Sequence, residues 1–98
     1  MQAWYPYCKM HAEQKLTSIT DASAAAFCGG MLYGQVEAMW PMCSSNPALG
    51  VDFSATQASS ATLALILVKF YEENAATTAT MEPRMVAWMA LLKAYPCR

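Results

Sequence analysis

The sequence predicts a small all-α protein: a compact bundle of three long helices and a short N-terminal helix, stapled by two disulfides. Apolar residues recur with helical spacing in several segments, and no segment alternates apolar and polar residues long enough to indicate a strand. Four cysteines among 98 residues are typical of a disulfide framework in an oxidising compartment. The length corresponds to a single domain, residues 1–98, whose small core needs such staples.

Two helices are predicted before residue 42. Pro6 suits the first turn of a short helix, with Tyr7 to Leu16 as its body. Asp21 is the candidate N-cap of a second, longer helix, which Pro41 ends. The apolar residues of the second helix follow helical spacing: Ala24, Phe27, Cys28, Met31, Leu32, Val36, Met39 and Trp40.

Three glycines lie inside this second helix, at positions 29, 30 and 34. Each lowers helix stability by about 1 kcal/mol relative to alanine, so a compensating contact is expected. Gly30 and Gly34 are four residues apart and share one side of the helix. We expect close packing of another segment of the same chain there, with a dimer seam as the alternative.

Two more helices are predicted in the second half of the chain. Ser54–Gln57 fits a capping box at the start of the third helix. Leu63, Ile66, Leu67 and Phe70 then form an apolar stripe that ends near Glu72–Asn74. Pro83 fits the first turn of the last helix, and Pro96 ends it. The connecting segments, 42–53 and 74–82, are predicted to be loops.

The disulfide pairing follows from the expected order of the helices. Short connections favour an up-down-up arrangement of the three long helices. Cys43 and Cys97 then lie at the same end of the bundle, and Cys8 on the N-terminal segment can reach Cys28. We therefore predict the pairs Cys8–Cys28 and Cys43–Cys97, in preference to a zinc site, because no short Cys-x-x-Cys spacing is present.

The composition argues against catalysis, cofactors and several kinds of partner. A net charge of −1 offers no basic patch for nucleic acid, and no apolar run is long enough to span a membrane. His11 is the only histidine, and we interpret it as a surface residue rather than the partner of a catalytic Cys8. The acidic residues are scattered, and no phosphate-binding glycine loop is present. We therefore expect a protein that is not an enzyme and binds no metal or other cofactor.

A family resemblance emerges from motifs spread along residues 8–97. Phe27-Cys28-Gly29-Gly30-Met31-Leu32-Tyr33-Gly34 resembles the Phe-Cys-x-Gly-Tyr-x-x-Gly signature of immunity proteins against type VI secreted peptidoglycan amidases. Cys8, Cys43, the segment from Val68 to Asn74 and the closing Ala94-Tyr95-Pro96-Cys97 extend the resemblance. The chain departs from the family pattern in two loops: Ser44-Ser45 follow Cys43 where Cys-x-Pro is common, and Ala75 replaces the proline of Glu-Asn-Pro.

The resemblance implies an exported, homodimeric helical protein that occludes its cognate amidase, in the fourth amidase effector and immunity family. That toxin resembles a papain-like cysteine peptidase, which cuts peptidoglycan stems between D-glutamate and diaminopimelate. In the family an immunity loop enters the toxin cleft, and the topology favours 73–82 for it, with 42–53 as second choice. The candidate toxin-binding residues are Glu73, Asn74, Ala75, Ala76, Thr77, Thr78, Thr80, Met81 and Glu82.

The expected disulfides favour an oxidising compartment, and we expect a periplasmic location. Since no targeting segment is visible, an exported protein would be present here in its mature form, with the signal peptide removed. Eight methionines and three tryptophans are more than so small a fold can bury, which indicates an apolar contact surface. Two alternative functions remain open. One is a small periplasmic holdase chaperone of the acid-stress type, and the other is a small carrier of lipid or another ligand.

Overall fold

The computed structural model describes residues 4–13 and 19–97. These residues form five α-helices and three short 3-10 helices, and no β-strand occurs among them, so the all-α prediction is confirmed. The backbone fills a flat volume of 41 × 29 × 16 Å. A molecule so thin cannot cover all of its apolar side chains, and several large ones stay exposed.

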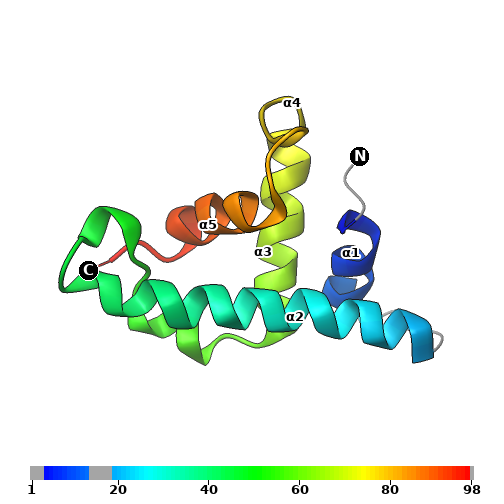
Figure 1. The fold of residues 1–98 in the computed structure, drawn as a ribbon, viewed down its shortest axis with the longest axis horizontal. Helices are drawn as coiled ribbons and strands as arrows, with labels where there is room; N and C mark the ends of the chain where they lie inside the picture. Colours follow the sequence, from blue (N-terminus) through cyan, green and yellow to red (C-terminus); the bar gives the residue numbers. More distant parts are fainter. Residues whose placement is uncertain (1–3, 14–18, 98) are drawn as a thin grey trace.

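Helix α1 (Tyr5–Glu13) packs beside the N-terminal half of the long helix α2 (Ile19–Met39) (Figure 1). Pro6 lies in the first turn of α1, as predicted. The expected continuation of this helix to Leu16 lies outside the described residues. Helix α2 begins two residues before Asp21, so the prediction that this residue is the N-cap is wrong and it lies within the first turn.

The buried side of α2 carries Cys28, Leu32, Val36 and Met39, which are spaced by four, four and three residues. This spacing keeps one stripe of the helix in the core. Pro41 ends the α-helix as predicted, but the chain continues as the 3-10 helix η1 (Trp40–Cys43). Two further 3-10 helices follow, η2 (Pro47–Leu49) and η3 (Phe53–Gln57).

The predicted capping box at Ser54–Gln57 is wrong, because these residues form η3 instead of the start of a helix. The carboxylate of Asp52 accepts a hydrogen bond from the Ser54 amide at 3.1 Å and caps the 3-10 turn. Gln57 donates to the Thr56 hydroxyl at 3.1 Å instead of reaching back to the cap. The next helix begins at Ser60, capped by Ser59.

Helix α3 (Ser60–Glu73) is followed by the short α4 (Ala75–Thr78) and by α5 (Pro83–Ala94). The Ser59 hydroxyl accepts a hydrogen bond from the Thr62 amide at 3.1 Å, a regular N-cap. The core residues of α3 and α5 are Leu63, Ala64, Leu67, Val68, Tyr71, Val86, Ala87, Ala90 and Leu91. Small alanines among them let the two helices pack closely.

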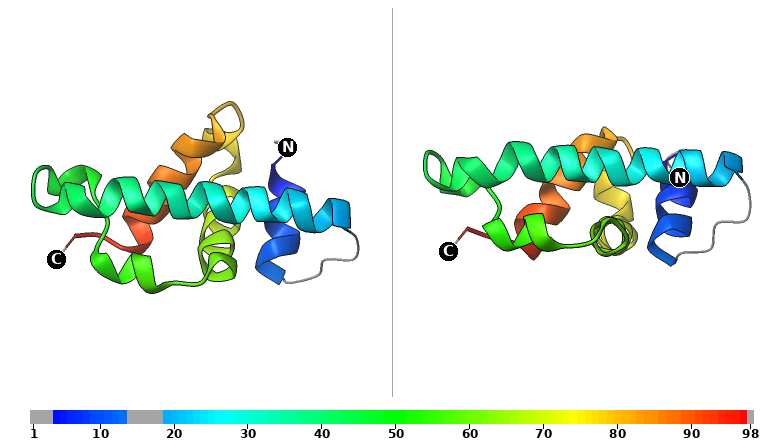
Figure 2. Two further views of the ribbon diagram at one scale, coloured as in Figure 1. Left: turned by 60° about the horizontal axis from the view of Figure 1, so that its bottom comes forward. Right: turned by 90° about the horizontal axis from the view of Figure 1, so that it is seen from below.

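The helices do not form the predicted up-down-up bundle. Helix α3 crosses α2 instead of lying alongside it, and α5 returns from the far end of α3 toward the C-terminal half of α2 (Figures 1 and 2). The crossing has a local cause at Gly29. A Cβ built on Gly29 would lie 3.2 Å from the Cβ of Ser60 and 3.2 Å from Nε2 of His11. Gly29 thus lets the first residue of α3 approach the backbone of α2.

The prediction that another segment of this chain packs closely against Gly30 and Gly34 is wrong. A Cβ on either residue would meet nothing within 4 Å, and both residues are exposed. The close approach occurs one residue earlier, on the neighbouring side of the helix.

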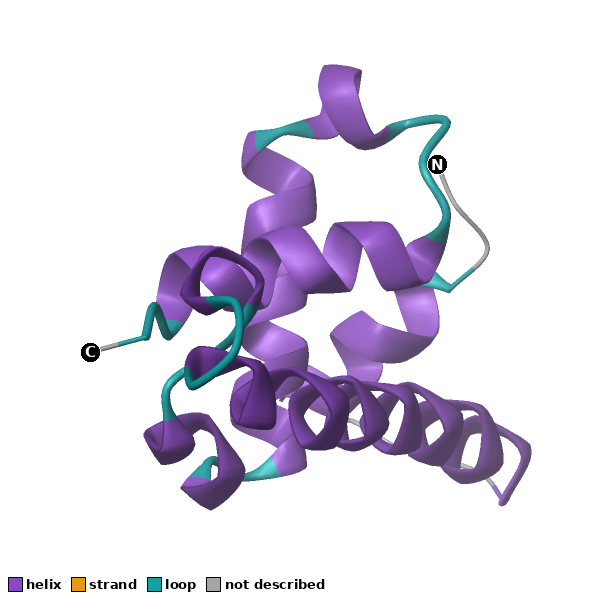
Figure 3. Ribbon diagram, turned by 60° about the vertical axis from the view of Figure 1, so that its left-hand side comes forward, coloured by secondary structure: helices purple, strands orange, loops and turns teal. Residues whose placement is uncertain are grey.

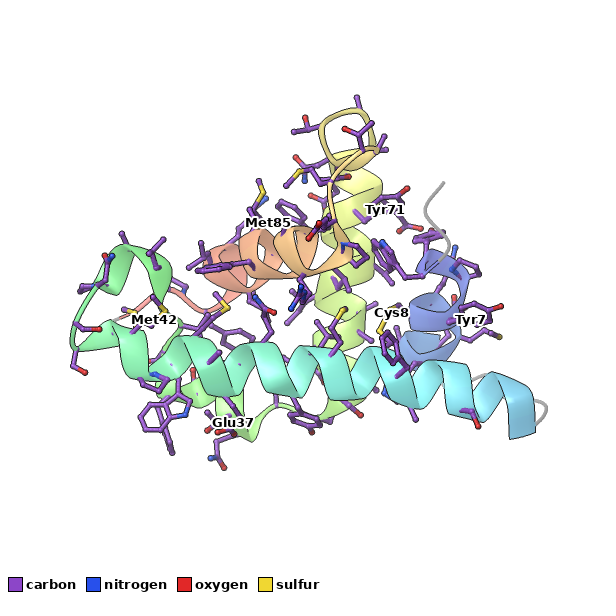
Figure 4. All side chains as sticks on the ribbon, viewed as in Figure 1. Tyr7, Cys8, Glu37, Met42, Tyr71 and Met85 are labelled. Carbon is purple, nitrogen blue, oxygen red and sulfur yellow. A yellow bond between two sulfur atoms is a disulfide. The ribbon has the colours of Figure 1, made fainter. Side chains whose placement is uncertain are left out.

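Both disulfides have the predicted pairing. Cys8–Cys28 joins α1 to α2, with Cys8 turned toward α2 (Figure 4), and Cys43–Cys97 joins η1 to the segment after α5. The Cys43–Cys97 pairing does not depend on the bundle geometry, because it requires only that the C-terminal ends of α2 and α5 meet. The two bridges indicate an oxidising compartment outside the cytoplasm.

Candidate partner-binding surface

The predicted binding loop forms a projection at the end of α3 that lies farthest from α2 (Figures 1 and 3). We call residues 74–82 the tip. The tip was expected to be an irregular loop, but its first half is the single-turn helix α4. An ordered turn at this position presents a convex surface of defined shape.

Hydrogen bonds hold the tip along most of its length. The Asn74 side chain donates to the Phe70 carbonyl at 2.9 Å and closes the end of α3. The Asn74 carbonyl accepts from both the amide and the hydroxyl of Thr78, each at 2.9 Å. The Met81 amide then donates to the Thr78 carbonyl at 3.1 Å, and the Glu82 carbonyl accepts from the first turn of α5.

The side chains of the tip divide into an outer and an inner group. Thr78 is fully buried and Met81 is half-buried against the core, so Thr78 holds the turn and cannot face a partner directly. The exposed residues of the tip are Ala75, Ala76, Thr77, Ala79, Thr80 and Glu82. The outer surface is therefore small and uncharged, with Glu73 and Glu82 at its base.

The acidic end of α3 has a structural explanation. Glu72 accepts a hydrogen bond from the Tyr5 hydroxyl and lies 3.5 Å from the Lys9 ammonium in an ion pair. The hydrogen bond from Tyr5 and the charge of Lys9 hold the pKa of the Glu72 carboxyl below its usual value. These contacts offset the unfavourable position of an acid at a helix C-terminus and attach α1 to α3.

The second-choice loop, residues 42–53, lies away from the tip, beyond the C-terminus of α2 at the left of Figure 1. Its aromatic residue Phe53 packs edge-on against Trp40, with ring centroids 5.3 Å apart. The indole nitrogen of Trp88 donates to the Leu49 carbonyl at 3.2 Å. This contact attaches the loop to α5.

Several exposed apolar residues were not singled out from the sequence. Phe27 is 73% exposed, although helical spacing placed it on the apolar stripe of α2. Met85 is 47% exposed on α5 and lies near the base of the tip (Figure 4). His11, expected to be a simple surface residue, lies 2.9 Å from the Ser60 hydroxyl and links α1 to α3. Periodicity alone cannot separate such edge positions from the core.

Within the described residues, no group of three or more His, Cys, Asp or Glu side chains could hold a metal ion. No helix in this part of the chain is both long and apolar enough to cross a membrane. No protein-family model, curated protein or solved structure matches the chain. Its function has to be inferred from its residues and their geometry.

Proposed function

We propose that this protein is a periplasmic immunity protein that occludes the active-site cleft of a secreted peptidoglycan amidase with its tip. The sequence resemblance suggests the class of partner. The observation that carries the proposal is the shape and chemistry of the tip. Residues 74–82 project from the body and are hydrogen-bonded, and the exposed residues between 75 and 80 have small uncharged side chains.

Such a tip suits steric inhibition of a concave site. The ordered turn loses little conformational entropy when it binds, so less of the interaction energy is spent on ordering it. Alanine and threonine side chains are narrow enough to enter a cleft that accommodates an extended peptide stem. The location fits as well, because two disulfides require an oxidising compartment and peptidoglycan lies in one.

The tip contains no exposed aromatic anchor, so we expect the affinity to come from its surroundings. Tight interfaces depend on a few large side chains inside a polar rim. Met85 is exposed next to the tip, and Met89 is exposed one turn further along α5. Glu73 and Glu82 supply charge at the base. In this arrangement the tip blocks the cleft and α5 contributes the apolar contact.

The first experiment mixes the oxidised protein with the amidase encoded beside its gene. Peptidoglycan hydrolysis and the mass of the complex are measured. We expect stoichiometric inhibition and a stable complex, whose mass also shows whether one or two copies of the immunity protein take part. Hydrolysis at the full rate in excess of this protein would contradict the proposal.

A matched pair of variants then separates the two loops. Ala76→Asp, Thr77→Asp and Thr80→Asp place three charges on exposed positions of the tip. Ser44→Asp, Ser45→Asp and Ala48→Asp place the same charge on exposed positions of the second loop. We expect the first set to weaken inhibition by about 30-fold or more, the effect of losing one strong interface contact, and the second to have little effect.

Circular dichroism of both sets provides the control for folding. If only the second set weakens inhibition, residues 42–53 and not the tip enter the cleft of the amidase. Full inhibition by both sets would contradict occlusion by either loop.

A further inference from the structure

A hollow of about 520 Å³ lies between α1, α2 and the start of α5. Trp4, Tyr7, Phe27 and Met31 line it together with the Cys8–Cys28 disulfide, and residues 82–84 complete the lining. Sites for small molecules have volumes of roughly 300–1,000 Å³ and are mostly apolar, with a few polar groups that orient the ligand. This hollow has both properties.

The polar groups of the hollow are one acid and one base. Glu82 and Arg84 flank Pro83 at the first turn of α5, and all three residues contribute to the lining. Neither charged side chain forms a hydrogen bond or an ion pair with another residue in the described part of the chain. Two opposite charges next to an apolar surface are therefore available to a ligand.

This combination selects one class of ligand. A purely anionic amphiphile would be attracted by Arg84 and repelled by Glu82, and a purely cationic one would meet the reverse. A zwitterion can place its ammonium group near Glu82 and its anionic group near Arg84. The aromatic rings of Trp4, Tyr7 and Phe27 favour an apolar body, and their faces also attract an ammonium group.

We propose that the hollow binds a zwitterionic amphiphile, a molecule with one apolar chain or ring and a head that carries an ammonium and an acidic group. The site goes beyond the proposed inhibition of an amidase and does not depend on it. Two kinds of molecule have this combination of groups, a single-chain lipid and an apolar amino acid. The titrations described next distinguish them.

The three tryptophans provide the readout. Trp4 lines the hollow, Trp40 packs on Phe53, and Trp88 donates to the Leu49 carbonyl. The three indole N–H signals in an NMR spectrum therefore report on three separate surroundings. Tryptophan-to-phenylalanine variants assign the signals. The protein is titrated with N-dodecyl-N,N-dimethylglycine, dodecanoate and dodecyltrimethylammonium, each below its micelle concentration, and with phenylalanine.

We expect the zwitterionic dodecyl probe to shift the Trp4 signal saturably, with Trp40 and Trp88 unchanged. It should bind about fivefold more tightly than either singly charged probe, the effect of one exposed ion pair. A Trp4 shift with phenylalanine would point to an amino acid as the source, and a shift with the dodecyl probe alone would point to a lipid. Equal shifts of all three signals, or no saturable shift with either zwitterion, would overturn the proposal.

Matched variants locate the site. Phe27→Ala and Phe53→Ala each remove an exposed phenylalanine, but only Phe27 lines the hollow. We expect weaker binding of the zwitterion by Phe27→Ala alone. Glu82→Gln should abolish the preference for the zwitterion over dodecanoate, and Arg84→Gln its preference over dodecyltrimethylammonium. Binding that survives Phe27→Ala and is equally sensitive to Phe53→Ala would show adsorption on exposed apolar surface and overturn the assignment.

Discussion

The two disulfides lie in differently built surroundings, one at the middle of α2 and the other just beyond its C-terminus. At the Cys8–Cys28 bridge, α1 is attached to α3 through side chains. The Tyr71 ring of α3 lies 4.9 Å from the ring of Trp4 and 5.1 Å from that of Tyr5, as ring centroids, and Figure 4 shows it between the two helices. The Tyr5–Lys9–Glu72 cluster and the His11–Ser60 contact add polar links.

At the Cys43–Cys97 end, the backbone itself makes the connection. The Asp52 amide donates to the Tyr95 carbonyl at 2.9 Å, and Val51 forms an isolated antiparallel bridge with Pro96. Gly50 fits so closely that an added Cβ would lie 2.7 Å from the Cys43 amide nitrogen. The disulfide joins η1 to Cys97, next to these backbone contacts.

We infer that one bridge mainly prevents local detachment of α1, whereas the other mainly restrains the unfolded chain. A helix attached by side chains can detach as a unit while the rest of the protein stays folded. A bridge across a long loop that includes α3 and α5 restrains the whole unfolded chain. Four perturbations test this comparison.

The largest effect is expected from removal of the Cys43–Cys97 bridge in the double variant Cys43→Ala/Cys97→Ala. Its sequence separation of 54 residues corresponds to about 4 kcal/mol of unfolding free energy in the chain-entropy model. Denaturant titration measures the loss. A loss of unfolding free energy smaller than that caused by removal of Cys8–Cys28 would contradict the expected order of the two effects.

Removal of the other bridge, in Cys8→Ala/Cys28→Ala, should lower the unfolding free energy by about 3 kcal/mol, because its separation is 20 residues. Its effect should also be local. Hydrogen exchange is expected to accelerate in α1 far more than in α3 and α5, since side chains alone then hold α1. Uniform acceleration in all helices would show that α1 does not detach separately.

The sequence allows prediction of the features that depend on the order of the helices and on residues that mark helix ends. The helical class, the turns at Pro6, Pro41 and Pro83, and the disulfide partners all follow from spacing and from residues with restricted backbones. The helix start could not be predicted correctly, because Ser54 carries the stronger local signal, with Gln57 three residues later, whereas Ser59 has Thr62 at that position. The carboxylate of Asp52 takes the Ser54 amide, and this choice depends on the path of the chain after Val51.

The connection between α3 and α5 was predictable in position but not in its internal structure. Loop composition indicated residues 74–82, yet the burial of Thr78 depends on a hydrogen bond across the turn to Asn74. The hollow between α1, α2 and α5 could not be predicted, because it joins Trp4, Phe27 and Arg84 from three distant segments. The crossing of α2 and α3 contributes to these neighbourhoods, and the sequence does not show which segment approaches Gly29.

A pair of glycine variants separates close backbone contact from open surface. Gly50→Ala is expected to destabilise the protein by about 1–3 kcal/mol, because its Cβ would meet backbone atoms at 2.7 and 3.0 Å. Gly30→Ala, in an exposed helical position with open space around it, should stabilise by about 0.5–1 kcal/mol. Denaturant midpoints give both values. Destabilisation by Gly30→Ala would indicate a contact on that face, such as a second copy of the chain.

The smallest effect is expected for Glu72→Gln, and its dependence on pH is the informative feature. The Tyr5 hydrogen bond, aided by Lys9, lowers the pKa of Glu72 below 4.5 in the folded protein. Its contribution to stability is therefore present above that pH and is lost as the pH falls through the folded value. The same hydrogen bond raises the pKa of Tyr5 above 10.0, so this contribution is also lost as the pH rises through that higher value.

The melting temperatures of the protein and of Glu72→Gln should thus differ at neutral pH and converge in acid. Glu73→Gln is the matched control, because Glu73 is the exposed neighbour and forms no ion pair within the described residues. A difference that persists unchanged as the pH falls through the lowered pKa of Glu72 would contradict the role of this carboxylate. Convergence would mean that the attachment of α1 to α3 responds to pH through its side chains.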